Sequence, residues 1–515
     1  MTAGTEALFQ RYGAAYKWLA TATVMLGTLS MTLATTIVNV AIPDIMADFG
    51  IAQSRAQWLS TGFLAAMTAC MLLSAWALSA LGMRAAYIGA MVVFILAALA
   101  GGLSVSADMV IVSRVLQGAM AGIIQPLAMT VIFQVFPPRQ RGLGMGIYGL
   151  GVILGPAVGP VLGGVLVDWF SWRAVFFLPL PTSVLGMVFA LLFTAGRDRD
   201  EPRPGFDWLG VALLCASLVC LLWATSNGQR LGWSSPLILG LLAAALVAAV
   251  AFVLWQLRCR EPLLNVRIFA VPGFAAGSAV GFCFGAALFG TTYLIPLFVQ
   301  DIQGFTATEA GLLLMPAGLV MALSFPVAGY LSDRVPPDVP IGAGLVLIAL
   351  SCFVLGYADA TTGFWVMAFW VIVGRVGMGL GLPSINTGSL RTLDFRLVSQ
   401  GAGAVNFSRQ LGGALGVNAL SVLLDRRTWF HTEVMAQMRT ADHPAHRELL
   451  RQFRELAGRL GVEPGRLEPD ALRFLGDVVY RQAYTLGFQD SFLALGVVFL
   501  LALFPAWLMG RFARQ

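Results

Sequence analysis

Long runs of apolar residues, separated by short polar segments, dominate this chain of 515 residues. A helix needs about 20 apolar residues to cross a hydrocarbon core about 30 Å thick. Fourteen stretches are long enough, at residues 17–42, 55–79, 84–104, 108–134, 141–167, 172–194, 207–226, 235–257, 273–299, 309–331, 338–358, 362–387, 400–424 and 488–510. This pattern predicts an all-α polytopic membrane protein with fourteen transmembrane spans.

The positions of lysine and arginine predict how these spans are oriented. If the N-terminus is inside, sixteen basic residues fall in the inner segments, and only Arg55, Arg173 and Arg230 fall in the short outer loops. Short cytoplasmic loops carry an excess of basic residues. We therefore expect both termini to be cytoplasmic.

Composition narrows the class of protein. With 58% hydrophobic and 11% charged residues, the chain is too apolar for a soluble protein. Its net charge of +6 is spread among short loops, which argues against nucleic acid as a partner. We find no paired carboxylates, no Ser/His/Asp set and no phosphate loop, so we expect no enzyme and no cofactor. The first 16 residues are polar and the apolar run after them is long, which argues against a cleavable signal peptide.

Cysteine and histidine point to no disulfide and no metal site. Five of the six cysteines lie in apolar spans and one lies in an expected cytoplasmic loop. All three histidines, His431, His443 and His446, lie in one long polar segment. A zinc site there would need a further ligand and a closed geometry, so solvated histidines are the favoured interpretation.

The stretch from Ile111 to Asp168 holds two apolar segments around a basic turn, PPRQR. The first segment carries Arg114, which in a membrane span should face a cavity or a polar partner. The second, which also holds Pro156, places glycines four residues apart and so on one side of a helix, at Gly151, Gly155, Gly159 and Gly163. Small residues on one face let two helix backbones approach closely in a membrane.

Two motifs in this stretch resemble signatures of the major facilitator superfamily. Gly151 to Gly164 is similar to its antiporter motif, and the preceding helix has a second similar motif in Arg114, Gln117, Gly118 and Gly122. The resemblance to the fourteen-span drug:proton antiporter branch, of the EmrB type, covers nearly the whole chain. Other similar segments are TTIVNVAIP (35–43), QWLSTGFL (57–64), WRAVFFLPLP (172–181), EPLLNVRIF (261–269), GFTATEAGLLLMP (304–316) and RQLGGALG (409–416).

The resemblance implies a major facilitator fold of two six-helix bundles. Residues 1–194 would form the N-terminal bundle, and residues 195–272 a linker with two extra spans. Residues 273–515 would form the C-terminal bundle, with a periplasmic loop at 425–487. Within each half, inverted three-span repeats are expected.

The loop at 425–487 is polar and has apolar residues at helical spacing from Leu449 to Leu460 and from Leu472 to Tyr484. Two short amphipathic helices are expected here. The loop is either a surface loop without a binding role or a docking site for a periplasmic adaptor and an outer-membrane channel. The resemblance to the EmrB type implies the docking site.

The chain departs from the family pattern in two places. The loop after the second expected span has Leu78 where the family has an aspartate, whereas the loop after the tenth span keeps GYLSDR. Asp333 and Arg334 are therefore candidates for a cytoplasmic latch, with a weak solvated pair as the alternative. The antiporter branch also has an aspartate where this chain has Ala34, and we find no carboxylate in the middle of any span.

These features predict an inner-membrane exporter of drugs or other amphiphilic small molecules that works by alternating access. Proton motive force is the expected energy source, and an outer-end acid such as Asp44 or Asp301 is then the expected proton carrier. The alternative is a voltage-assisted exporter of an anionic metabolite, fatty acid or lipid. Candidate substrate-binding residues are Thr35, Thr36, Asn39, Arg114, Gln117, Tyr293, Asn386 and Asn406. Candidate gating residues are Gly151, Gly155, Pro156, Gly159, Gly163, Asp333 and Arg334.

Overall fold

The computed structural model describes residues 3–51, 53–56, 58–197, 204–437, 451 and 467–513, and in these residues all regular structure is helical. The first helices are α1 (Ala3–Tyr12), η1 (Gly13–Ala15), α2 (Tyr16–Phe49), α3 (Gln53–Ala56), α4 (Trp58–Cys70), α5 (Leu73–Gly102), α6 (Ala107–Val135), η2 (Pro138–Gln140), α7 (Arg141–Trp169), α8 (Ala174–Phe177) and α9 (Leu180–Phe193). Two helices follow, α10 (Trp208–Leu231) and α11 (Pro236–Arg258). The remainder are η3 (Val266–Ala270), α12 (Pro272–Asp301), α13 (Ala307–Ser332), α14 (Asp338–Leu355), α15 (Phe364–Arg391), η4 (Phe395–Leu397), α16 (Val398–Gln437), α18 (Leu467–Leu501) and α19 (Leu503–Ala513).

Helices occupy all fourteen expected stretches, and twelve helices in the described residues are long and apolar enough to cross a membrane. The stretches at 55–79 and 400–424 are outside that set. A break at Met71 and Leu72 leaves α4 only 13 residues long, and α16 is more polar than the other long helices. The prediction of an all-helical multi-pass membrane protein is therefore confirmed, and the count of fourteen spans stays a prediction.

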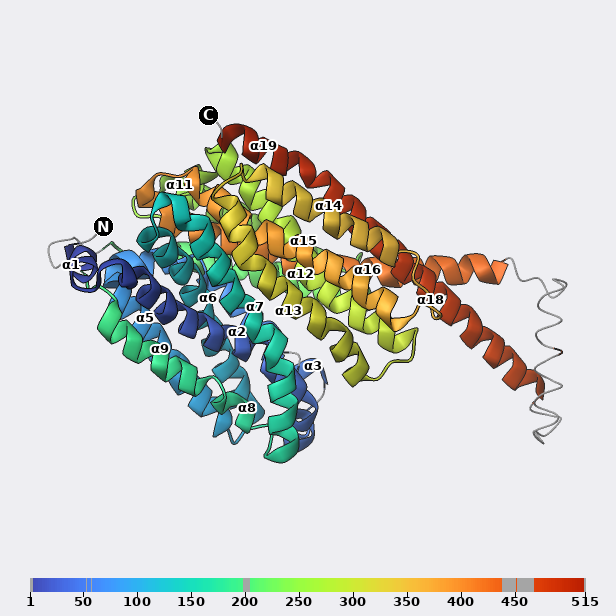
Figure 1. Cartoon of the computed structure of the whole chain (residues 1–515). Helices are drawn as coiled ribbons and strands as arrows, with labels where there is room; N and C mark the ends of the chain where they lie inside the picture. The colour runs from blue at the N-terminus through green and yellow to red at the C-terminus, as the bar shows by residue number, and fades with distance from the viewer. Residues whose placement is uncertain are drawn as a thin grey trace.

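The helices pack around three clusters of buried apolar side chains. One cluster lies among α2, α4, α5 and α6, and a smaller one joins α2 to the end of α8. The third cluster lies in the later part of the chain and joins side chains of α12, α13, α14, α15 and α18. The helices α10 and α11 pack mainly on each other. Between the early and late helices, the main contacts are α7 with α13 and α6 with α16 (Figure 1).

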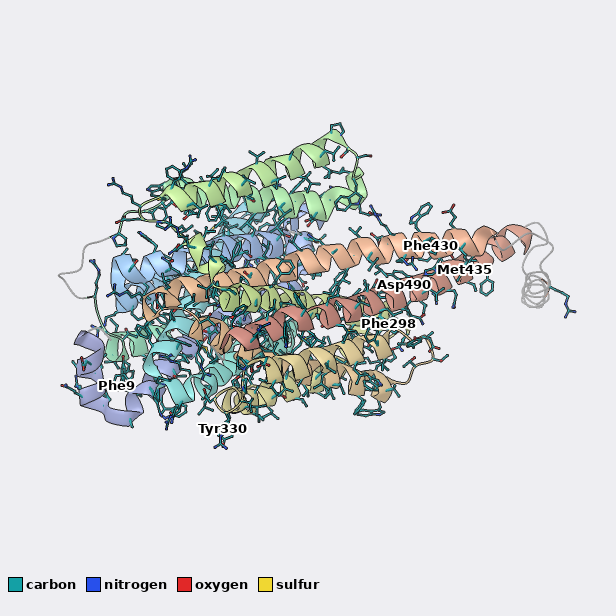
Figure 2. All side chains as sticks on the ribbon, turned by 90° about the horizontal axis from the view of Figure 1, so that it is seen from above. Phe9, Phe298, Tyr330, Phe430, Met435 and Asp490 are labelled. Atoms are coloured by element: carbon teal, nitrogen blue, oxygen red, sulfur yellow. The ribbon has the colours of Figure 1, made fainter. Side chains whose placement is uncertain are left out.

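Both chain termini lie at one end of the bundle, opposite the end where α16 and α18 project beyond the other helices (Figure 1). We call these the basal end, which includes Phe9 and Tyr330 near the end of α13, and the distal end, which includes Phe430 and Asp490 (Figure 2). The expected helix at Leu472 to Tyr484 exists, but it is part of the continuous helix α18. The expected helix at Leu449 to Leu460 lies almost entirely outside the described residues.

Side chains that the sequence places at helix starts satisfy the first free amides. Ser106 accepts from Met109 at the start of α6, and Asp207 accepts from Gly210 at the start of α10. Thr306 and Glu309 form a reciprocal capping box at the start of α13. Such caps stabilise a helix by about 1 kcal/mol each, and here they fix where the short loops end.

Glycines on α6 allow α4 to approach it closely. A Cβ at Gly118 would lie 2.1 Å from the Phe63 carbonyl oxygen, and one at Gly122 would lie 2.2 Å from that of Met67. These distances are shorter than any real contact, so α4 and α6 could not pack this way with alanine at either position. In a membrane, this close backbone packing is a principal source of helix association.

We predict different stability changes for two glycine-to-alanine substitutions. Gly118→Ala should destabilise the fold by roughly 1–3 kcal/mol, because the added methyl group overpacks the α4–α6 contact. Gly89→Ala is the matched control, since nothing lies within 4 Å of its Cβ position, and it should be neutral or stabilising by up to about 1 kcal/mol. Thermal unfolding of the purified variants in detergent measures both. Equal shifts for the two variants would contradict the proposed packing.

Candidate functional site

Arg114 is fully buried where α6 meets α2 and α4. Its Nε donates to the Leu59 carbonyl oxygen at 3.0 Å, and its Nη1 donates to the Ala34 carbonyl oxygen at 2.9 Å. Nη1 also donates to Oε1 of Gln117, one helical turn away, and the guanidinium lies 4.2 Å from the centre of the Phe63 ring. Arg114 thus connects three helices through neutral acceptors.

The environment of Arg114 shows the consequence of Ala34. Ala34 has no polar side chain and contacts the guanidinium through its backbone carbonyl oxygen. Within the described residues, Nη2 of Arg114 has no hydrogen-bond partner. A buried donor without a partner is uncommon, and it marks a place where a further ligand could bind.

Arg375 on α15 has a similar environment in the later part of the chain. Its Nη2 donates to Oγ1 of Thr292 on α12 at 2.8 Å, and its Nη1 lies 3.6 Å from Sδ of Met378. The i to i+3 pair of Arg375 and Met378 matches that of Arg114 and Gln117. Thr292 belongs to a threonine pair, as Thr36 does on α2. Arg114 thus contacts α2, and Arg375 contacts α12.

A third intramembrane arginine lies where early and late helices meet. Arg409 on α16 donates to Oδ1 of Asn406 and interacts with the Tyr148 hydroxyl of α7. Asn406 is buried, and its Nδ2 donates to the Ala402 carbonyl oxygen and approaches Sδ of Met129 on α6 at 3.1 Å. The α16 residues thus form a polar connection to α6 and α7.

In the described part of the chain, none of these three arginines forms an ion pair. Ion pairs there include Arg55 with Asp108, Arg173 with Asp48, Arg391 with Asp333, and both Arg427 and His431 with Asp490. An uncompensated charge away from water is costly. The three guanidinium groups therefore favour anions.

The other predicted substrate-binding residues lie in different surroundings. Thr35 donates to the Met31 carbonyl oxygen and is half-buried, whereas Asn39 is exposed and accepts from Ser60 on α4. Tyr293 is half-buried, with its hydroxyl 3.5 Å from Oγ of Ser421. Asn386 is buried, and its Oδ1 has no partner in the described residues.

The predicted glycine face of α7 packs against α2. A Cβ at Gly155 would lie 2.2 Å from Oγ1 of Thr32, and one at Gly159 would lie 2.5 Å from Oγ1 of Thr36. Gly151 and Gly163 lie on the same face, opposite Met25 and Ile37, whereas Pro156 is exposed. This face therefore joins two early helices, α2 and α7.

A second set of glycines on α7, which we did not single out from the sequence, packs against α13. A Cβ at Gly142 would lie 2.3 Å from the Gly329 carbonyl oxygen, and one at Gly146 would lie 2.4 Å from that of Phe325. Gly149 lies against the Phe325 ring. The spacing from Gly142 to Gly146 is a signal that could have found this contact.

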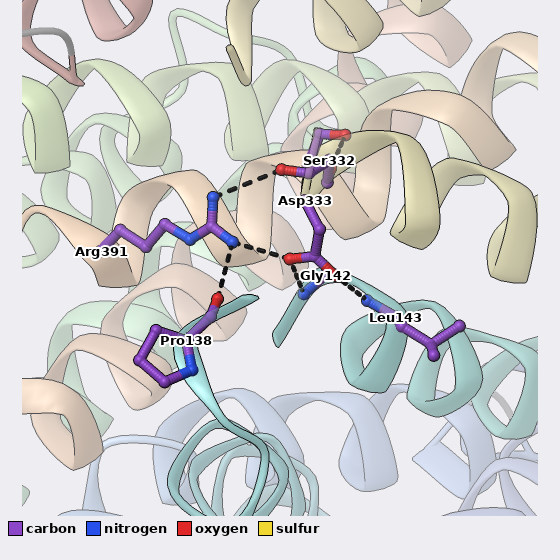
Figure 3. Close-up of polar contacts among 7 residues, drawn as sticks. Pro138, Gly142, Leu143, Ser332, Asp333 and Arg391 are labelled. Atoms are coloured by element: carbon purple, nitrogen blue, oxygen red, sulfur yellow. Dashed lines mark hydrogen bonds and ion pairs between the residues drawn. The ribbon is translucent and has the colours of Figure 1, made fainter. Parts of the chain in front are cut away.

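Asp333 closes the basal end of this contact (Figure 3). Its Oδ1 accepts from the Gly142 amide at 2.8 Å, and its Oδ2 accepts from the Leu143 amide at 2.9 Å. These are free amides of the first turn of α7, where a negative charge also interacts favourably with the helix dipole. Asp333 is thus a cap supplied by α13 to a helix far from it in sequence.

Arg391, rather than Arg334, is the basic partner of Asp333. Its Nη2 lies 2.7 Å from Oδ1 of Asp333 and 3.3 Å from the Pro138 carbonyl oxygen, and its Nη1 donates to the Ser332 carbonyl oxygen. Arg334 instead lies over the Tyr330 ring. Sequence reasoning missed Arg391 because it is 58 residues from Asp333 and comes from the end of α15.

We predict that Asp333→Asn weakens the start of α7. The variant loses the ion pair and the charge that accepts from two amides, each worth about 1.5–3 kcal/mol. Hydrogen exchange over residues 138–146 should rise about tenfold or more. Asp108→Asn is the matched control, because it removes an exposed pair with Arg55, and it should leave this segment unchanged. Unaltered exchange in Asp333→Asn would show that Asp333 does not hold the helix start.

Comparison with known proteins identifies the same superfamily that the sequence motifs resemble. The family model described as Major Facilitator Superfamily matches residues 24–417. The chain is 30% identical over 475 residues to the MFS-type transporter YhcA of Bacillus subtilis, covering 91% of this chain and 88% of that protein. It is 26% identical over 492 residues to the multidrug export protein EmrB of Escherichia coli, covering 95% and 94% of the two chains.

Solved structures show the same fold. The proton:xylose symporter XylE, a protein of this superfamily, superposes with a TM-score of 0.62 and covers 96% of each chain at 13% identity, which bears on the fold alone. From the match of the family model and the extent of the similar relatives, the chain belongs to the major facilitator superfamily and is a multi-pass membrane transporter rather than an enzyme.

Proposed function

We propose that this protein is an exporter of amphiphilic small molecules in the bacterial inner membrane and works by alternating access. One observation carries the proposal: the close glycine contacts between α7 and α13 lie near the start of α7, at the basal end. They are at Gly142, Gly146 and Gly149, and Ile153 joins the buried cluster of the late helices. Further along α7, Gly155 and Gly159 contact α2 instead, and Val158 and Val161 are exposed.

The proposed topology follows from the sequence. Fourteen spans, with both termini in the cytoplasm, place the basal end inside. Residues 1–194 and 273–515 form the two moving bundles, and 195–272 adds α10 and α11. In this orientation, the Asp333 latch holds the inner gate shut, and substrate enters from the membrane or cytoplasm when the latch opens. The proposed substrate site lies between Arg114, Thr36 and Gln117 on one side and Tyr293 and Asn406 on the other. Asn386 would line its basal side, because it is two residues past Ser384, which contacts Ser332 beside the latch.

Drugs are the first substrate class to test, because the similar protein EmrB is named for multidrug export. A proton-driven cycle needs a carboxylate that is shielded in one conformation. Asp301 is a candidate, since its Oδ2 accepts from the Tyr484 hydroxyl of α18 at 3.1 Å near the distal end of α12. Asp44 is the second candidate, near the end of α2.

A second candidate function is voltage-assisted export of an anionic metabolite, fatty acid or lipid. The three arginines without an ion pair favour it, because guanidinium stays protonated and attracts anions. Moving one negative charge outward along an inside-negative potential yields about 2.3 kcal/mol per 100 mV, which corresponds to roughly fiftyfold accumulation.

Transport by purified protein in liposomes separates these candidates. Voltage is imposed without a pH gradient, and then a pH gradient is imposed with voltage clamped, for one cationic dye and one anionic amphiphile. Proton coupling predicts transport under the pH gradient alone. Voltage-driven anion export predicts transport of the anion under voltage alone. No transport of either compound under either gradient would overturn the exporter proposal for both substrate classes.

We predict that Arg375→Gln lowers anion transport at least tenfold, because it removes a buried cation that has only a hydroxyl and a thioether as partners. Arg230→Gln, an exposed arginine that donates to Asn227, is the control and should transport as the unmodified protein does. Transport of the cationic dye serves as a second readout. An equal loss for anion and cation would indicate a structural role for Arg375.

A periplasmic adaptor and an outer-membrane channel are proposed partners, with the projecting parts of α16 and α18 as the dock. The two helices are held together by Asp490, which accepts from Arg427 at 2.6 Å and lies 2.7 Å from His431. Figure 2 shows Phe430 and Asp490 on these helices. Trp429 is 75% exposed and Tyr480 is 55% exposed, so aromatic surface is available beyond the bundle.

We predict that replacing both Trp429 and Tyr480 by serine spares transport in liposomes but lowers drug resistance in cells at least several-fold. Trp365→Ser is the control, because Trp365 is 79% exposed but lies on α15 rather than on α16 or α18. It should leave both readouts intact. Parallel loss of transport and resistance in the double variant would instead assign these aromatics to the transporter itself.

A further inference from the structure

A cavity of about 500 Å³ opens at the basal end, between α1, the turn from α6 to α7, and η4. Its walls are mainly apolar, with the rings of Phe9, Phe136 and Phe395. Two cations line it, Lys17 from the start of α2 and Arg141 from the start of α7. None of its lining residues is acidic.

Lys17 has neutral neighbours only among its described contacts. Its Nζ donates to Oε1 of Gln140 at 2.7 Å and lies 5.4 Å from the centre of the Trp18 ring and 5.7 Å from that of Phe136. No described ion pair includes it. The ammonium group is therefore held in place at the cavity wall without a counter-charge.

Arg141 is also without an anionic partner in the described residues. Its guanidinium stacks 4.1 Å from the centre of the Phe133 ring, and its Nε is buried with no hydrogen-bond partner. Arg141 is the first residue of α7, where the helix dipole disfavours a positive charge. An anion in the cavity would relieve both conditions.

The helix α1 closes one side of this cavity in the way an interfacial helix would. Leu8, Phe9 and Tyr12 pack onto the core, and the Phe9 and Tyr16 rings meet edge to face at 4.6 Å. Glu6 and Gln10 are exposed. A helix with one apolar face and one polar face lies in the plane of the membrane surface, at the depth of lipid headgroups.

We propose that this cavity binds an acidic phospholipid of the cytoplasmic leaflet. Its phosphate lies between Lys17 and Arg141, and an acyl chain follows the Phe9, Phe136 and Phe395 rings. The leaflet assignment rests on the topology of the proposed function. The bound lipid contacts η4 as well as the early helices, and it lies beside the amides held by Asp333. It therefore stabilises the arrangement that is closed at the basal end, since a ligand favours the state that completes its site.

Lipid binding is measured by native mass spectrometry of the whole protein in neutral detergent, titrated with phosphatidylglycerol or phosphatidylcholine. A basic residue near an anionic lipid is worth about 1 kcal/mol, so Lys17→Gln should weaken phosphatidylglycerol binding about fivefold and Lys17→Gln with Arg141→Gln about thirtyfold. Lys17→Arg should retain binding. Arg139→Gln is the matched control, because Arg139 is an exposed residue of the same turn outside the cavity lining, and it should bind normally.

Hydrogen exchange over residues 138–146 gives the conformational readout in lipid nanodiscs. Phosphatidylglycerol should slow this exchange equally in the unmodified protein and in Arg139→Gln, and should slow it less in Lys17→Gln. Equal protection by inorganic phosphate would overturn the lipid assignment in favour of a free anion. Undiminished phosphatidylglycerol binding in the double variant, or equal loss in Arg139→Gln, would overturn the site. Neither measurement uses a transport substrate, so the lipid-binding result can be interpreted even if the exporter proposal fails.

Discussion

The basal closure depends on one carboxylate that caps a helix from another part of the chain. Asp333 accepts from the Gly142 and Leu143 amides, and its side chain is 7% exposed, so water competes poorly for these bonds. Because α7 is held by α2 along one face and by α13 near its start, this contact couples the early helices to the late ones. Arg391 neutralises the charge and adds a bond to Pro138, so that α15 is tied to the same point.

A second constraint is the scarcity of charge compensation inside the bundle. Arg114 and Arg375 donate only to neutral acceptors, namely carbonyl oxygens, a side-chain amide, a hydroxyl and a thioether, and the position of the expected aspartate holds Ala34. Neutral acceptors orient a guanidinium but leave its positive potential largely intact in a medium of low polarity. The same arrangement that fixes the helices therefore provides an attractive site for an anion, whether that anion is a substrate or accompanies one.

The sequence was sufficient for the helical membrane class and the superfamily, because both follow from long apolar runs and from local motifs. The sequence was less informative where function depends on which helix faces contact one another. The glycines from Gly151 to Gly163 were visible as a pattern, yet their partner, α2, was not. The contacts of Gly142 and Arg391 were missed because both residues meet the end of α13, which is distant from each of them in sequence. Asp333 is 191 residues from Gly142 and 58 residues from Arg391. The continuity of α18 was also missed, because the polar residues in its first half led us to predict a loop there.

The two connections between early and late helices are of different physical kinds. At the start of α7, Asp333 provides a charged cap. The early helices have Leu78, within α5, where the family pattern has an aspartate. There α16 packs sterically, with the Cβ position of Gly403 lying 2.9 Å from the Met71 carbonyl oxygen. A charged cap weakens when its charge is neutralised or another anion competes for the amides. A steric glycine contact responds only to displacement of the helix. Opening of the basal end is therefore expected to begin at α7 and α13, where chemical signals can act, and to spread to α16 through Tyr148 and Arg409.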